Sequence, residues 1–215
     1  MKRYILAATT VGAFLFLLTL GAQHASANVV TFQLTSDHCT GGCLGTATSA
    51  GTITITDVSS GVVSVDVTLG SGFKFVNGGF DTGFGFNLNG DPTITFSGVS
   101  SGFTPNANPE SAGSLHMDGT GFFEYGVNCT GCGSGGSSPL AGPLDFTITG
   151  SGLSTSKFEQ NANGQFFAVD IIGNGNTGGV DASTGTNTVP DGGMTLTLLG
   201  GALVGLESLR RKFWV

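Results

Sequence analysis

Residues 51–69 alternate between apolar and polar side chains with a period of two, which is the repeat of an extended strand and not of a helix. Within Gly51–Asp57, Ile53 and Ile55 occupy one face and threonines occupy the other. Ser59-Ser60-Gly61 then provides a turn, and a second alternating segment follows it. The stretch therefore predicts a β-hairpin with one buried face and one solvent-facing face.

The same kind of pattern recurs between residues 28 and 172. Short segments rich in Val, Ile, Thr and Phe are separated by breaks that contain Gly or Asn, and glycine accounts for 38 of the 215 residues. Regular turns of this kind favour an all-β fold, an antiparallel β-sandwich or jelly roll, over a parallel α/β fold. The further strand candidates are Val29–Leu34, Phe73–Val76, Gly83–Leu88, Thr93–Ser97, Leu115–Met117, Gly121–Val127, Leu144–Gly150 and Phe166–Ile172.

The chain begins like a secretory signal peptide. Lys2-Arg3 precedes an apolar run from Tyr4 to Leu20, and Ala25-Ser26-Ala27 places small residues at the two positions that a signal peptidase reads. We predict that residues 1–27 form a signal helix that is cleaved before Asn28, after export by the general secretion machinery. A retained N-terminal membrane anchor is the alternative.

The chain ends with a short motif, an apolar run and a basic cluster. These are Val189-Pro190-Asp191-Gly192-Gly193, then Met194–Leu206, then Arg210-Arg211-Lys212. As a helix the apolar run would span about 20 Å, whereas a bilayer core is about 30 Å thick. The length favours a temporary anchor over a permanent one, and the basic cluster would stay on the cytoplasmic side as a membrane stop.

This order resembles the C-terminal sorting domain of the PEP-CTERM family of exported bacterial proteins, and Val-Pro-Asp-x-Gly is closest to its VPDSG-CTERM variant. Gly192 stands where that variant's name has Ser. The resemblance is confined to residues 189–215. It implies processing by an exosortase-like enzyme, transient anchoring in the inner membrane, and delivery to the cell surface or extracellular matrix in the context of exopolysaccharide and biofilm.

The charge balance excludes several partners. Residues 28–190 contain twelve carboxylates but only two basic side chains, Lys74 and Lys157, so twelve minus two gives a formal charge of −10. Phosphate backbones and anionic membrane surfaces repel such a domain, which excludes nucleic acid as a partner. Cations, neutral sugars and other proteins are the classes that remain.

Four cysteines form two closely spaced pairs, Cys39 with Cys43 and Cys129 with Cys132. In an exported chain an even number of cysteines predicts disulfides. The glycine-rich loops favour the two local pairings, and cross pairings that staple the two loops together are the alternative. A structural zinc site is a further interpretation of two separated cysteine pairs.

No catalytic residue and no metal ligand set is assigned. His38 and His116 are the histidines outside the signal peptide, and the chain has no G-x-S-x-G nucleophile elbow. Tyr125 is the one Tyr or Trp outside the terminal segments that is available for stacking on a sugar ring. Calcium is a candidate ligand for two oxygen-rich stretches, although neither matches the EF-hand loop or the Gly-Gly-x-Gly-x-Asp repeat and turns favour Asn and Asp in any case. The stretches are Asp81, Asn87, Asn89 and Asp91, and then Asp170, Asn174, Asn176 and Asp181.

We therefore expect a non-enzymatic exported protein with a structural or adhesive role and no cofactor. Its expected partners are signal peptidase, an exosortase-like enzyme and extracellular polysaccharide. A carbohydrate- or calcium-binding β-sandwich module is the alternative, and a secreted hydrolase ranks third. The β domain is expected over 28–172, and residues 173–188, rich in Gly, Asn and Thr, are predicted to be a flexible spacer before the sorting signal.

Overall fold

The computed structural model describes residues 27–77, 82–106, 115–133 and 135–188. These residues are all-β, with antiparallel strands and one short 3-10 helix, η1 (Thr155–Lys157). Among them no helix is long and apolar enough to cross a membrane. The expected signal helix, up to Ser26, and the expected sorting signal, residues 189–215, lie outside the described residues.

The first sheet has six strands in the order β16-β1-β3-β4-β12-β7. The predicted hairpin forms its centre, because β3 and β4 pair antiparallel with Ile53 opposite Val67 and Ile55 opposite Val65. These four side chains are buried, as the period-two pattern predicts. The strands are β1 (Val29–Gln33), β3 (Gly51–Ser59), β4 (Val62–Leu69), β7 (Thr95–Ser97), β12 (Leu144–Thr149) and β16 (Gly185–Thr188).

The second sheet has the order β2-β15-β14-β6-β11-β8, with β5 also paired to β14 and β13 also paired to β6. A separate hairpin consists of β9 (Leu115–Met117) and β10 (Gly121–Phe123). The strands of the sheet are β2 (Ser36–Asp37), β5 (Lys74–Phe75), β6 (Phe84–Leu88), β8 (Thr104–Pro105), β11 (Tyr125–Asn128), β13 (Phe158–Glu159), β14 (Phe167–Gly173) and β15 (Asn176–Ala182).

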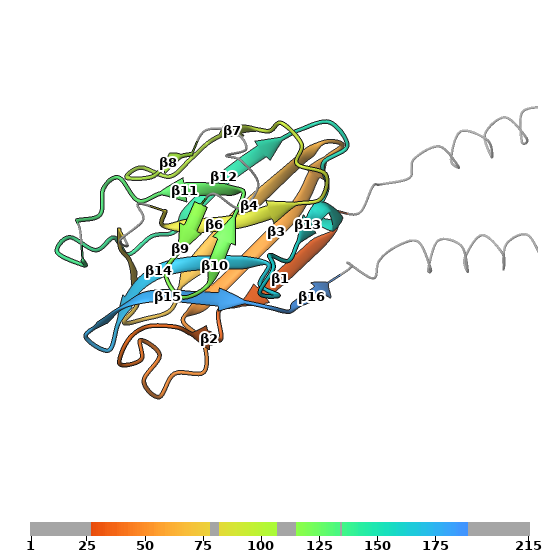
Figure 1. The fold of residues 1–215 in the computed structure, drawn as a ribbon. Helices are drawn as coiled ribbons and strands as arrows, with labels where there is room; N and C mark the ends of the chain where they lie inside the picture. Colours follow the sequence, from red (N-terminus) through yellow and green to blue (C-terminus); the bar gives the residue numbers. More distant parts are fainter. Residues whose placement is uncertain (1–26, 78–81, 107–114, 134, 189–215) are drawn as a thin grey trace, which may run out of the picture. The chain divides into compact units, whose positions relative to one another are not determined.

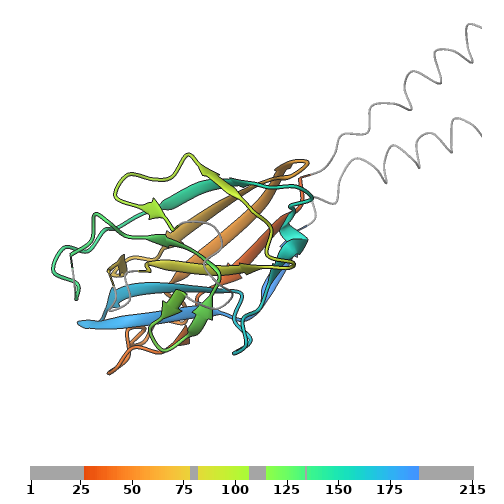
Figure 2. The same cartoon turned by 45° about the horizontal axis from the view of Figure 1, so that its top comes forward.

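The two sheets form layers, as Figures 1 and 2 show. Their inward-facing side chains share one core that is rich in Phe. Phe84 of β6 stacks on Phe167 of β14 with ring centroids 5.8 Å apart. Phe84 also meets Phe146 of β12, in the other sheet, at 5.8 Å. Each fully buried Phe stabilises the fold by about 1.5–3 kcal/mol, so these rings are a main source of attraction between the layers.

The prediction of a flexible spacer over residues 173–188 is wrong. Strand β15 pairs with β14 along its whole length, and its Val180 and Ala182 are fully buried. Strand β16 pairs with β1. A glycine that suggested flexibility is required by packing, because a Cβ atom on Gly179 would overlap the carbonyl oxygen of Asp118. The strands of the folded domain therefore continue to Thr188.

The β9–β10 hairpin covers the outer face of the second sheet, the face turned away from the first sheet (Figure 1). Two glycines that lie opposite each other, Gly85 and Gly126, make this face flat enough for the hairpin to approach. A Cβ on Gly85 would lie 3.0 Å from the ring of Phe123, and a Cβ on Gly126 would lie 3.0 Å from Leu115. The contact forms a second small core of Leu115, Met117, Phe123 and Ala168.

Candidate functional site

Buried polar groups gather around the turn of the β9–β10 hairpin. The carbonyl oxygen of Thr120 accepts hydrogen bonds from the side-chain amides of Asn161, at 3.1 Å, and Asn163, at 3.2 Å. Gly119 lies against His38, because a Cβ on this glycine would come within 2.6 Å of the histidine Cβ. We use the name turn site for the group formed by His38, Asp118, Thr120, Asn161, Asp170 and Asp181.

Asp181, in β15, is a buried carboxylate with partners. It is 1% exposed, and its Oδ2 lies 2.6 Å from Nε2 of His38. Burial raises the pKa of Asp181, while hydrogen bonds from His38, Ser36 and Gln165 act in the opposite direction. The pair joins the loop after β2 to β15, and thus fixes one side of the hairpin turn.

Ser36, His38 and Asp181 are the residue types of a hydrolytic triad, but their geometry does not suit that chemistry. Oγ of Ser36 lies 3.0 Å from Nε2 of His38, the same ring nitrogen that contacts Asp181. A triad histidine uses one nitrogen for the serine and the other for the carboxylate. Because one nitrogen serves both partners here, the cluster is a hydrogen-bonded brace of the loop and does not favour a hydrolase.

Asp170, in β14, is a buried carboxylate of a different kind. It is 1% exposed, and its Oδ1 has no hydrogen-bond partner among the described residues. Burial raises the pKa of Asp170 to about 7, and the negative charge of Asp118 acts in the same direction. Its backbone is fully engaged, since its N–H donates to Gly83 and its carbonyl accepts from Val76.

A second acidic group forms where β13 pairs with β6. The N–H of Glu124 donates to Oδ1 of Asn87 at 2.9 Å, and the amide of Asn89 donates to Glu159 at 2.8 Å. Burial, together with a hydrogen bond to Asp91 and the charges of Asp91 and Glu159, raises the pKa of Glu124 to about 7. Glu124 and Glu159 are functional candidates that the sequence patterns did not connect with the first oxygen-rich stretch.

The two predicted oxygen-rich stretches therefore have different fates. Asn87, Asn89 and Asp91 come together with other acids, whereas Asp81 lies outside the described residues. The second stretch divides, because Asp170 and Asp181 lie under the hairpin while Asn174 and Asn176 lie at the turn between β14 and β15. Only the pairing of strands reveals this separation, since the four residues are close in sequence.

Both local disulfides are present, Cys39–Cys43 and Cys129–Cys132, as the glycine-rich loops predicted. The described residues contain no free cysteine. The zinc interpretation is therefore wrong, because sulfur atoms joined in disulfides do not act as thiolate ligands. The same reason excludes a thiolate metal site at Asp37, whose carboxylate lies close to the sulfurs of the first pair.

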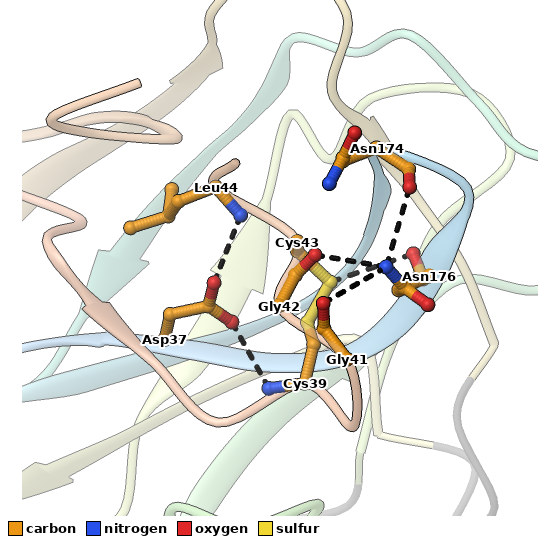
Figure 3. Close-up of a disulfide and its surroundings, with 8 residues drawn as sticks. All are labelled: Asp37, Cys39, Gly41, Gly42, Cys43, Leu44, Asn174 and Asn176. Atoms are coloured by element: carbon orange, nitrogen blue, oxygen red, sulfur yellow. Dashed lines mark hydrogen bonds between the residues drawn. A yellow bond between two sulfur atoms is a disulfide. The ribbon is translucent and has the colours of Figure 1, made fainter. Parts of the chain in front are cut away.

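The first disulfide loop is clamped from both sides (Figure 3). The Asp37 carboxylate accepts N–H bonds from Cys39 at 3.0 Å and from Leu44 at 2.8 Å. Burial alone would raise the pKa of Asp37, but the bonds from the Leu44 and Cys39 amides outweigh burial and lower it. On the other side, Nδ2 of Asn176 donates to the carbonyls of Gly41, Gly42 and Asn174 at 3.3, 2.9 and 3.2 Å.

The aromatic side chains differ from the sequence-based expectation. Tyr125 is 2% exposed and its hydroxyl donates to the Pro92 carbonyl at 2.7 Å, so it offers no stacking surface to a sugar. Phe122, by contrast, is 55% exposed and contacts the ring of His116 with centroids 4.8 Å apart. The sequence predicts that the Phe residues face the core. Phe122 does not, because its neighbour Phe123 faces the second sheet and successive side chains of a strand point to opposite sides.

A groove lies beside β1 and near the start of β16. Phe32, Phe158 and Phe166 line it together with polar residues that include Asn28 and Thr155. Phe32 and Phe166 are in contact with ring centroids 5.2 Å apart. The groove therefore combines an aromatic wall with hydrogen-bonding groups, next to the residue at which the mature chain is expected to begin.

The remaining predicted site residues are at or beyond the ends of the described region. Ala27 is exposed and Asn28 is half-buried, whereas Ala25 lies outside the described residues. The same holds for the sorting motif Val189–Gly193 and for the membrane stop Arg210–Lys212. Comparisons with protein families, with curated proteins and with solved structures give no match to this chain.

Proposed function

We propose that this chain is an exported protein of the bacterial cell surface or extracellular matrix, delivered by two terminal segments that processing enzymes remove. The observation that supports this best is the pairing of β1 with β16, in which Val29 lies opposite Thr188. Cα atoms opposite each other in antiparallel strands are about 4.5–5.5 Å apart. The expected signal-peptidase site before Asn28 and the expected motif from Val189 therefore adjoin one cross-strand pair.

This arrangement suits a protein that passes from one membrane-bound enzyme to another. The segments that precede Asn28 and follow Thr188 both start from the same end of the folded domain. An exosortase-like enzyme would then cut near Val189–Gly193 while the strands of residues 29–188 stay paired. The cut would release the domain to the cell surface or matrix.

The chemistry of the domain supports the same compartment. Two disulfides in a domain of this size fit an oxidising environment outside the cytoplasm. The excess of carboxylates over lysines keeps such a domain soluble and away from anionic surfaces. We interpret the two packed sheets as a β-sandwich of the jelly-roll type with a structural or adhesive role beside exopolysaccharide.

The groove beside β1 favours a second candidate function, the binding of a neutral polysaccharide. Sugar and small-ligand sites combine aromatic walls with a few placed polar groups, and Phe166 with Asn28 and Thr155 offers this combination. Replacing Phe166→Ala should abolish co-sedimentation with the host's exopolysaccharide, while Phe122→Ala, an exposed aromatic change elsewhere, should not. Equal binding of exopolysaccharide by both variants would show that the groove is not the binding site.

The main proposal is tested by the intact mass, without reduction, of the protein recovered from its host's envelope and culture fluid. We expect a chain that begins at Asn28 and ends within Val189–Gly193. It should be four hydrogen atoms lighter than the reduced chain, because two disulfides are closed. A recovered chain that ends at Val215 would contradict sorting, and one that begins at Met1 would contradict cleavage on export.

A further inference from the structure

We propose that the turn site binds one calcium ion between Asp170 of β14 and Asp118 of the hairpin turn. The proposal does not depend on the route of export. It rests on a buried oxygen of Asp170 that has no hydrogen-bond partner among the described residues, on the Asp118 carbonyl that lies over the strand position opposite Asp170, and on the fact that no described basic side chain pairs with Asp170.

The first step is the electrostatics of Asp170. Its side chain is 1% exposed and its Oδ1 is not hydrogen-bonded to any described residue. A carboxylate in such a place is unfavourable unless a proton or a cation neutralises it. Within the described residues, the ion pair at this place joins His38 to Asp181, and no basic side chain pairs with Asp170. Neutralisation must therefore come from solution, and a dissolved metal cation is one source.

The second step is the geometry above β14. Asp170 lies directly opposite Gly179 in β15. Since Gly179 has no side chain, the carbonyl oxygen of Asp118 rests on it. Side chains opposite each other in antiparallel strands are about 4.5–5.5 Å apart at Cβ. The Asp118 carbonyl thus lies on the hairpin side of the strand position next to Asp170, and the Asp118 side chain itself is exposed.

The third step is the choice of ion. The oxygens at this place are carboxylate and carbonyl oxygens, which calcium and magnesium prefer, whereas zinc and copper prefer nitrogen and sulfur. Among the described residues, no set of three His, Cys, Asp or Glu side chains includes Asp170 within metal-binding distance. A site with two carboxylates, a carbonyl and water suits calcium, which accepts irregular geometry, better than magnesium, which demands an octahedron.

Such an ion would fasten the hairpin to the sheet. The β9–β10 strands already pack on Gly85 and Gly126 through the small core around Met117. An ion shared by Asp118 and Asp170 would add a bond at the turn, in addition to the packing of Gly119 against His38. Calcium should therefore stabilise the fold and not merely bind to its surface.

The experiment uses the full chain, purified in mild detergent with its disulfides intact and stripped with a chelator. Calorimetric titration with calcium chloride should show one site with a Kd on the order of 10⁻⁴–10⁻³ M, the range of extracellular modules. Thermal unfolding followed by circular dichroism should shift upward in about 10 mM calcium, a concentration above that range. Magnesium chloride at the same concentration should give a smaller shift.

Three variants assign the site. Asp170→Asn keeps the size of the side chain and should abolish both the calorimetric signal and the thermal shift. Asp118→Asn should weaken binding by about tenfold, the effect of losing one favourable interaction of about 1.4 kcal/mol. Asp66→Asn, the same chemical change at an exposed position of β4, should bind calcium like the wild type.

The proposal is overturned if the wild type shows neither binding heat nor a thermal shift in calcium. It is also overturned if Asp170→Asn binds as tightly as the wild type, or if magnesium stabilises the chain as much as calcium. Should Asp170→Asn fail to fold, the exposed Asp118→Asn variant decides the matter, and unchanged affinity in that variant rejects the site.

Discussion

Nε2 of His38 and Oδ2 of Asp181 lie 2.6 Å apart, and they join the loop after β2 to a buried strand of the second sheet. Replacing His38→Ala should destabilise the fold by about 1–3 kcal/mol, because a buried carboxylate loses one of its hydrogen-bond donors. Urea unfolding at neutral pH measures the loss. Ser36→Ala removes a half-buried hydroxyl that contacts both the histidine and Asp181. It should cost less, because the 2.6 Å contact of His38 with Asp181 remains, and an equal cost for both variants would contradict the importance of that contact.

Glu124 should make the domain less stable as the pH rises. Its pKa is about 7 in the folded protein against an ordinary value of 4.5. The folded state therefore holds the proton more tightly, and the stabilisation that is present below pH 4.5 is lost as the pH rises through 7. After allowance for solvent screening, the loss is about 1–2 kcal/mol. Urea unfolding across this interval measures the slope.

The variant Glu124→Gln should reduce that slope and should be more stable than the wild type above pH 7, while the part due to Asp170, whose pKa burial also raises to about 7, should remain. Glu159→Gln should alter the slope less, because the charge of Glu159 comes after burial and Asp91 among the causes of the shift. A slope in Glu124→Gln as steep as that of the wild type would show that Glu124 does not contribute and would assign the whole pH dependence to other groups such as Asp170.

The glycine at position 85 should be intolerant of any side chain. Gly85→Ala would place a methyl group 3.0 Å from the Phe123 ring, so the hairpin has to move away from the sheet. We expect a loss of about 1–3 kcal/mol, the usual cost of overpacking, in urea unfolding. Gly70→Ala is the matched control, since its Cβ would have its nearest neighbour at an ordinary 3.5 Å. Equal losses of stability in the two variants would mean that the hairpin does not require a glycine at position 85.

Asn176 should control the order of the first disulfide loop. Asn176→Ala removes the donor shared by the carbonyls of Gly41 and Gly42, so amides of residues 39–44 should exchange with deuterium faster while the disulfide stays closed. Mass-spectrometric hydrogen exchange measures this change. Asn174→Gly keeps the backbone carbonyl and the positive φ of 49°, and it should leave the loop protected.

The sorting motif should determine the fate of the chain in its host. Asp191→Ala alters the expected recognition motif, so the uncut chain should accumulate in the membrane fraction, where an antibody to the domain detects it by its larger mass. Thr186→Ala changes an exposed side chain of β16 and should be processed normally. Normal release of the Asp191→Ala protein would show that an enzyme does not read this motif.

Local patterns were sufficient for some of these features. The alternation around Ile53 and Ile55 predicts a strand, because successive side chains of a strand face opposite sides whatever lies around them. The close spacing of Cys129 and Cys132 within a glycine-rich loop likewise favours a local disulfide. Both are decided by a few neighbouring residues, and the structure agrees with both.

Other features depend on contacts between distant segments, which local patterns do not contain. Asn, Gly and Thr near Gly179 suggest a flexible chain, yet the glycine is there because the Asp118 carbonyl occupies the space of a side chain. Asp170 and Asp91 both look like turn residues in the sequence. The pairing of β14 with β15 buries Asp170. Asp91 hydrogen-bonds with Glu124, which is distant in the sequence.

The pairing of β1 with β16 also determines how the domain would respond to mechanical load. Thr188, the last residue of β16, lies opposite Val29, the first residue of β1. A force that pulls these two ends apart acts perpendicular to the strands, in the direction of the hydrogen bonds between them. The hydrogen bonds therefore break one after another, beginning with the pair at Val29 and Thr188. If the chain remains attached through one end and is pulled through the other, β16 should peel from β1 at low force while β3, β4 and β12 keep their pairing.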